Sequence, residues 1–115
     1  MIKVKILRNS EGGIVGYNVE GQSGYSRKGR DIVCAAVSIL TQNSLIALHE
    51  VCGVDEENIK YYIDDKEGIL KVLLQGNLNE VQRNNVYIVL STMELGIKNL
   101  MESYPENVRL EDEEV

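Results

Sequence analysis

The sequence predicts an α+β fold in which a largely antiparallel sheet packs with two main helices, in the order ββαββαβ. Short segments with strand-like patterns occur in both halves of the chain, and two longer segments carry apolar residues at helical spacing. With 115 residues, 43% of them hydrophobic, the chain is long enough for one ordinary core. We therefore expect one domain over residues 1–110, followed by an acidic tail over residues 111–115.

The first two strands are predicted to form a hairpin. In residues 2–8 apolar side chains alternate with basic ones, and this period of two indicates a half-buried strand. Residues 14–20 supply a second strand. Between them, Gly12 and Gly13 can take the positive φ angles that a tight connection requires.

The longest apolar segment of the chain follows a glycine-rich basic segment. Residues 21–30 contain three glycines, three basic residues and no acidic residue, which is typical of a mobile surface loop. Residues 32–48 are apolar on nearly every side, as expected of a helix buried by its neighbours. Asp31 is the predicted N-cap of this helix, and Gly53 is the predicted stop.

The second half of the chain predicts another hairpin, a second helix and a short final strand. Residues 59–63 and 69–74 have strand patterns around an acidic turn. Apolar residues between positions 78 and 101 recur at helical spacing and predict a helix of about 25 residues that ends before Pro105. Residues 108–110 add the last strand.

The charge is unevenly distributed along the chain. Twelve basic and eighteen acidic residues give a net charge of −6, but residues 1–30 carry +4 (six basic, two acidic) and residues 31–115 carry −10 (six basic, sixteen acidic). The acidic run at positions 111–114 is most simply a solvated tail. Direct nucleic-acid binding is not expected, because it relies on basic surface that neutralises phosphates. A basic protein partner fits this composition better.

Composition also suggests the compartment. No stretch approaches the roughly 20 apolar residues of a membrane span, and the start lacks the long apolar core of a signal peptide. We therefore expect a cytoplasmic protein with no membrane partner. In that compartment Cys34 and Cys52 are expected to be reduced thiols, so each needs an explanation in packing or reactivity.

Cys34 is the main candidate for chemistry. If Asp31 is the N-cap, Cys34 is the third helical residue, close to backbone N–H groups that have no intrahelical acceptor. A helix N-terminus and nearby cations favour the reactive thiolate form of a cysteine. Ser38 lies one turn later on the same helix face. The alternative is that Cys34 is a packing residue, since cysteines are often buried and this one lies in an apolar run.

Other chemistries find less support in the sequence. His49, the one histidine, would lie roughly 22 Å along the helix from Cys34, too far to act as its base. A metal site and a cofactor are not expected, because His49 and Cys52 alone make a poor ligand set. A phosphate or nucleotide site at the glycines is weak, since their spacing fits neither nucleotide fingerprint.

Residues 21–38 carry a resemblance to a known family. The run GQSGYSRKGRDIVCAAVS, which follows a strand, resembles the signature of the ribosomal-processing cysteine protease family, Prp. The similarity extends through the N-terminal hairpin, the central hairpin, the long second helix and the closing residues 104–110. This resemblance implies an endopeptidase of Firmicutes and related bacteria, which removes the N-terminal extension of large-subunit ribosomal protein twenty-seven.

The resemblance also implies a site, and one position departs from it. The nucleophile falls on Cys34, but the family's histidine, directly after the glycine that ends the second strand, is Gln22 here. Glutamine cannot take a proton from a thiol near neutral pH, so we expect little or no proteolysis. The family also implies a homodimer and a flexible loop over the site. The residues expected to bind substrate or support the site are Gly21, Ser23, Asp31 and Ser38.

Three explanations of Gln22 stay open at this point. The chain is an inactive engineered variant, a natural member whose thiolate is stabilised by the helix end alone, or a homologue that binds its target without cutting it. The last of these is the alternative function: a non-catalytic module that holds a basic ribosomal-protein segment.

Overall fold

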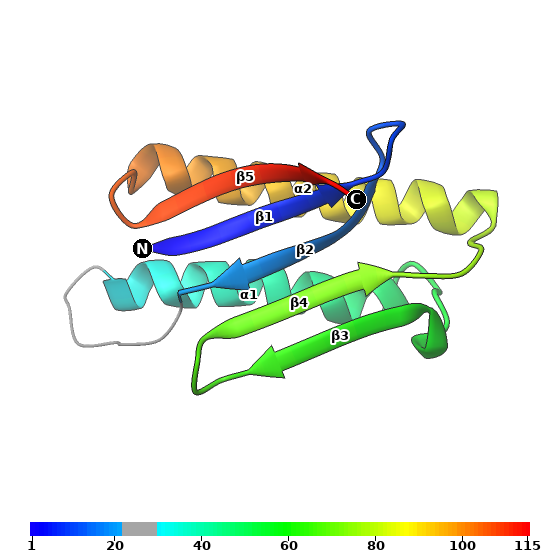
Figure 1. Cartoon of the computed structure of the whole chain (residues 1–115), viewed down its shortest axis with the longest axis horizontal. Coiled ribbons are helices and arrows are strands. Elements are labelled where there is room, and N and C mark those ends of the chain that lie inside the picture. The colour runs from blue at the N-terminus through cyan, green and yellow to red at the C-terminus, as the bar shows by residue number, and fades with distance from the viewer. Residues whose placement is uncertain (22–29) are drawn as a thin grey trace.

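The computed structural model describes residues 1–21 and 30–115, and it confirms the predicted α+β class (Figure 1). Five strands form one sheet in the order β3-β4-β2-β1-β5. Neighbouring strands are antiparallel except for β1 and β5, which are parallel. The elements are β1 (Ile2–Arg8), β2 (Ile14–Glu20), α1 (Arg30–Glu50), the short 3-10 helix η1 (Glu56–Asn58), β3 (Ile59–Asp64), β4 (Ile69–Leu74), α2 (Glu80–Ser103) and β5 (Val108–Glu114).

The predicted hairpins are confirmed. β1 and β2 pair antiparallel, and Gly12 in their turn has a φ of +83°, a conformation that favours glycine. β3 and β4 form the second hairpin. β4 pairs with β2, and this pairing joins the two hairpins into one sheet.

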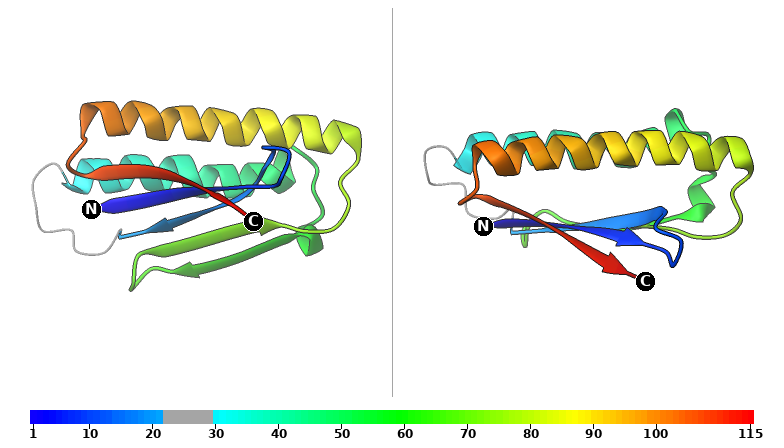
Figure 2. Two further views of the ribbon diagram at one scale, coloured as in Figure 1. Left: turned by 45° about the horizontal axis from the view of Figure 1, so that its top comes forward. Right: turned by 90° about the horizontal axis from the view of Figure 1, so that it is seen from above.

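Both helices cover the same face of the sheet, and the core lies between the two layers (Figure 2). The phenol of Tyr17, which is fully buried, donates a hydrogen bond of 2.6 Å to the backbone oxygen of Thr41, so β2 is tied to α1 by a polar contact as well as by packing. No helix of the described residues covers the other face of the sheet (Figure 2). The largest fully buried aliphatic side chains are Ile2, Val4, Ile6, Val19, Val33, Val37, Leu48, Val54, Leu90 and Ile97.

The prediction that the first helix is buried on nearly every side is wrong. Ile32, Ile39 and Ile46 are 65%, 70% and 59% exposed, and their seven-residue spacing places them on one helix face. The reason is the number of neighbours: α1 has the sheet below it and α2 beside it, which leaves the remaining face in solvent. By length and hydropathy alone, Ile32–Glu50 could cross a membrane, a test that core helices of globular proteins also pass.

α2 begins and ends where local sequence signals place it. The side chain of Asn79 accepts a hydrogen bond from the Gln82 backbone N–H at 2.8 Å, and the Gln82 side chain accepts one from the Asn79 backbone N–H at 3.0 Å. This reciprocal pair is a capping box. The helix ends at Ser103, before Pro105, as predicted.

The prediction that residues 111–115 form a solvated acidic tail is wrong for the backbone. β5 continues to Glu114 and pairs with β1 as far as Arg8. The acidic side chains meet basic ones on β1: Arg8 Nε lies 3.1 Å from Asp112 Oδ1, and Lys5 Nζ lies 3.3 Å from Glu113 Oε1. Basic side chains on β1 therefore compensate the acidic side chains of residues 111–114, which from the sequence alone are typical of a solvated tail.

Deleting residues 111–115 should lower the free energy of unfolding by about 2 kcal/mol. The deletion removes the outer half of the β1–β5 ladder, including the hydrogen bond of 2.8 Å from Val115 N to Arg8 O, and several such bonds at a net 0.5–1.5 kcal/mol each give roughly this loss. Urea denaturation followed by circular dichroism measures it. An unchanged transition would show that the acidic segment is a tail after all.

Candidate active site

The chain leaves the sheet at Gly21 and returns at the start of α1, and both points lie at the same end of the molecule (Figure 1). Gly21 has a φ of +88°, and a Cβ at this position would lie 2.3 Å from the backbone oxygen of Met1. Only glycine satisfies both conditions without strain. Gly21 therefore sets the direction in which the chain leaves β2, and its backbone lies close to the start of β1.

The predicted N-cap of α1 is corrected by the structure. Helical backbone begins at Arg30, so Asp31 is the second helical residue and Cys34 is the fifth, not the third. Arginine is a good helix former, which explains why the helix extends over position 30. Cys34 consequently lies in the second turn of α1. The backbone N–H groups without intrahelical acceptors are in the turn before it.

The structure places Cys34 and Ser38 together on one face of α1, one turn apart. Cys34 is 4% exposed and belongs to the hydrophobic core cluster, whereas Ser38 is half-buried. Neither cysteine of the chain is in a disulfide, and both are buried. This burial agrees with a packing role for Cys34, and its role as nucleophile stays a prediction.

Several predicted site features lie outside the described residues. Gln22 and Ser23 belong to positions 22–29, as does most of the predicted basic loop, and of Asp31 only the backbone is described. Their roles stay predictions.

His49 lies at the opposite end of α1 from Cys34, because the helix runs unbroken from Arg30 to Glu50. The fifteen residues between them correspond to roughly 22 Å along the axis. His49 instead closes the turn after α1: its Nδ1 lies 2.8 Å from the backbone oxygen of Val54, and its Nε2 lies 3.7 Å from a carboxylate oxygen of Glu56. It is therefore not the base for Cys34.

This arrangement makes the stability of the protein depend on pH. The hydrogen bond from the ring to Val54 O raises the pKa of His49, and the carboxylates of Glu56, Glu50 and Asp55 raise it further. A folded-state pKa above the unfolded value of about 6.5 stabilises the fold below that pH, and this contribution is lost as pH rises through the folded value. We expect a higher urea midpoint near pH 6 than near pH 8, with a smaller difference in a His49→Gln variant. An equal pH dependence in both proteins would contradict this assignment.

A polar hollow at the Cys34 end of the sheet was missed by sequence reasoning. Lys3 and Arg109 line it beside Gly21, together with two carboxylates. The pairing of β1 with β5 brings these two basic residues together, and no local pattern signals a parallel pairing over such a sequence distance. Within the described residues no three His, Cys, Asp or Glu side chains are grouped as metal ligands. The hollow is lined by Met1, Lys3, Glu20, Gly21, Glu67, Ile69 and Arg109.

Comparison with known protein families identifies the class as the cysteine proteases. The fold, with Cys34 near the start of α1, agrees with this class. A model of one family in this class matches residues 1–109. Because the match spans nearly the whole chain, this chain belongs to that family, the cysteine protease Prp family. The resemblance drawn from residues 21–38 is thereby confirmed at the level of the family.

Individual relatives agree with this membership. The ribosomal processing cysteine protease Prp of Staphylococcus aureus (strain Mu50 / ATCC 700699) is 30% identical over 112 residues, covering 96% of this chain and 97% of the relative. The crystal structure of the S. aureus protease with a substrate peptide has a TM-score of 0.79 at 26% identity, covering 98% of this chain and all of that one. SMU.848 from Streptococcus mutans has a TM-score of 0.84 at 27% identity, covering 100% of this chain and 96% of its own.

Proposed function

We propose that this chain has the scaffold of an endopeptidase that removes the N-terminal extension of large-subunit ribosomal protein twenty-seven, with Cys34 as its nucleophile. The observation that carries the proposal is family membership over residues 1–109 with Cys34 at the head of α1. The S. aureus relatives are named for ribosomal processing, and one of them was solved with a substrate peptide. Both names support the same substrate class here.

The proposed reaction follows the chemistry of a thiol nucleophile. The Cys34 thiolate attacks the carbonyl carbon of the scissile peptide bond, and the C–N bond breaks once the leaving amine has gained a proton. The resulting thioester is then hydrolysed by water, which releases the carboxylate product and regenerates the thiol. Gly21, Ser23, Asp31 and Ser38 support or shape this pocket.

Position 22 is where the proposal departs from an ordinary protease. A histidine there would accept the thiol proton and return it to the amine, but the Gln22 side chain has no basic nitrogen. We therefore propose that this chain has low or no proteolytic activity. Incubating it and its Cys34→Ala variant with the precursor protein, followed by mass spectrometry, tests this. Rapid cutting by the unmodified chain would contradict it.

The second candidate function is a non-catalytic module that holds a basic ribosomal-protein segment. Two observations favour it: Gln22 in the family's histidine position, and the charge of −10 over residues 31–115 (six basic, sixteen acidic). Binding of the precursor that survives Cys34→Ala, with no cleavage by either protein, would select this function. Loss of binding would remove it.

Two further parts of the proposal rest on the resemblance and on the composition. The family implies a homodimer, and the composition agrees with a cytoplasmic protein that needs no cofactor and binds neither membrane nor nucleic acid. Sedimentation velocity measures the oligomeric state.

A further inference from the structure

β3 is an open edge of the sheet. It pairs only with β4 among the described strands, and Tyr61, Tyr62 and Ile63 are 60%, 53% and 44% exposed. Edge strands are usually protected by charged residues, proline or bulges, since their unpaired backbone groups can pair with another chain. β3 carries two charges, Lys60 and the terminal Asp64, and no proline. Its backbone is therefore open to a further strand.

The register shows which backbone groups face outward. Gln75 N donates to Asn58 O at 2.9 Å, just before β3 begins. Because hydrogen-bonded and non-hydrogen-bonded pairs alternate in an antiparallel ladder, Lys60 and Tyr62 turn their backbone groups toward β4. Tyr61 and Ile63 consequently present their N–H and C=O groups to the open edge.

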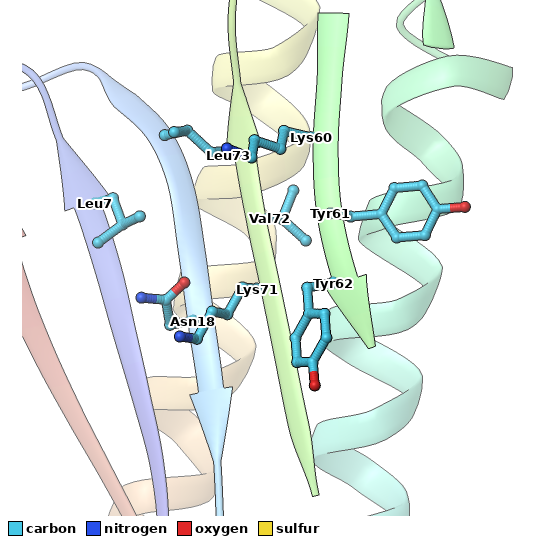
Figure 3. Close-up of a pocket in the computed structure, with 8 residues that line it drawn as sticks. All are labelled: Leu7, Asn18, Lys60, Tyr61, Tyr62, Lys71, Val72 and Leu73. Carbon is cyan, nitrogen blue, oxygen red and sulfur yellow. The ribbon is translucent and has the colours of Figure 1, made fainter. Parts of the chain in front are cut away.

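Two hollows border β3, one on each face of the sheet. On the helix side a groove forms between α1 and β3, and Figure 3 shows the Tyr61 ring extending toward α1. On the helix-free face a second hollow lies beside Tyr62 and Lys71 (Figure 3). An added strand sends alternate side chains to opposite faces, so one set would enter the groove and the other would lie beside Tyr62, at the rim of the second hollow, which extends from β3 across the sheet to Leu7. The groove is lined by Leu45, Ile46, His49, Glu50, Glu56, Ile59, Tyr61 and Ile63.

Charge indicates what the groove would bind. Glu50 and Glu56 line its far end, and Asp55 and Glu57 flank Glu56 in sequence. The facing hollow carries Lys60 and Lys71 instead, neither of which pairs with a carboxylate among the described residues. A matching peptide has basic side chains toward the groove and apolar or acidic ones toward the other face. The body of a ribosomal protein supplies basic segments, because it must neutralise RNA phosphates.

We propose that the substrate segment on the C-terminal side of the scissile bond adds to β3 as a sixth strand, antiparallel to it. This inference rests on the proposed function and extends it to a docking surface. β3 runs toward the end of the molecule where α1 begins, so a chain that leaves Cys34 along this edge runs opposite to β3 (Figure 1). Leu45 is eleven residues from Cys34, roughly 16 Å along α1, which about five extended residues span.

The test is a binding measurement on the Cys34→Ala protein, which cannot cut the probe. The probes are two fluorescent peptides from the ribosomal protein precursor. The short one extends about two residues beyond the scissile bond and stops before β3, and the long one extends about ten residues and covers β3. We expect the longer peptide to bind at least about tenfold more tightly, a difference of 1.4 kcal/mol. The combined Glu50→Lys and Glu56→Lys changes should remove that advantage and leave the affinity for the short peptide unchanged.

Matched variants separate docking from general electrostatics and from misfolding. The charge-matched control combines Glu102→Lys and Glu106→Lys. Glu102 is an exposed residue of α2, and both positions are far from β3 in sequence. This control should keep the advantage of the long peptide. Ile63→Pro removes one outward N–H without altering the ladder to β4, and it should weaken only the long peptide. Circular dichroism reports whether each variant is folded.

The outcomes are distinguishable. Equal affinity for both peptides, or equal loss in the control charge variant, overturns docking at β3. A dimer that Ile63→Pro dissociates shows that a second copy occupies the edge and overturns it as well. If the short peptide is neither bound by this protein nor cut by a Gln22→His variant, the proposed function fails. If that variant cuts the short peptide while extra length adds no affinity, only the docking proposal fails.

Discussion

Replacing Gln22 by histidine should raise the rate of precursor cleavage by about 10²–10⁴-fold, the usual contribution of a general base. Position 22 directly follows Gly21, whose φ of +88° and contact with Met1 fix where the chain leaves the sheet. That point lies at the same end of the molecule as Cys34 on α1 (Figure 1). An imidazole there would take the thiol proton that an amide cannot take. Peptide cleavage followed by mass spectrometry gives both rates.

A Gln22→Asn variant is the matched control, because it changes the side chain and keeps the amide. Its cleavage rate should stay at the level of the parent chain. If parent and Gln22→His cut equally and rapidly, position 22 does not supply the base. If neither cuts but both bind the precursor, the binding function is favoured over the protease.

Replacing Gly16 by alanine should lower the free energy of unfolding by about 3 kcal/mol, at the upper end of what overpacking usually costs. Gly16 is buried in β2 between β1 and β4, opposite Leu73. A Cβ at this position would lie 2.2 Å from the backbone oxygen of Val72 and 3.1 Å from the Cα of Leu73. Both are backbone atoms inside a ladder, so relief requires β2 and β4 to separate. Chemical denaturation measures the loss.

Gly13→Ala is the control for this change. Its Cβ would come within 3.2 Å of the Asn9 side chain, which needs to shift only slightly while its Oδ1 keeps accepting from Glu11 N and Gly13 N, and Gly13 does not have a positive φ. We expect a small effect there, within about 0.5 kcal/mol. Similar losses at Gly13 and Gly16 would show that the close approach of β2 to β4 is not the cause.

Local patterns predicted most of the fold. The strand over residues 2–8 alternates from Ile2 to Ile6, before Leu7 breaks the pattern, and this shows its buried face. The Asn79 capping box lies within the range where the helix start was expected. The parallel pairing of β5 could not be predicted, because its acidic side chains are compensated by Lys5 and Arg8, about one hundred residues away in sequence. The exposed face of α1 was missed for a similar reason: burial depends on how many elements surround a helix.

The candidate site was predicted less completely. The motif around Cys34 identified the family, and the single unbroken helix places His49 where it cannot serve as base. The start of α1 was misjudged by two residues, since the helix already begins at Arg30 and not after Asp31. Lys3 and Arg109 meet beside Gly21 only once β1 and β5 are paired, and the groove beside Ile63 exists only because β3 is an edge.

Cys34 and position 22 are proposed to form the catalytic pair of this scaffold. The most direct measurement is precursor cleavage by four proteins: the parent chain, Gln22→His, Cys34→Ala, and the variant that carries both changes. We predict that Gln22→His alone cuts rapidly, and that Cys34→Ala abolishes this gain. Rapid cutting by the parent chain, or cutting by Gln22→His that survives Cys34→Ala, would contradict the claim.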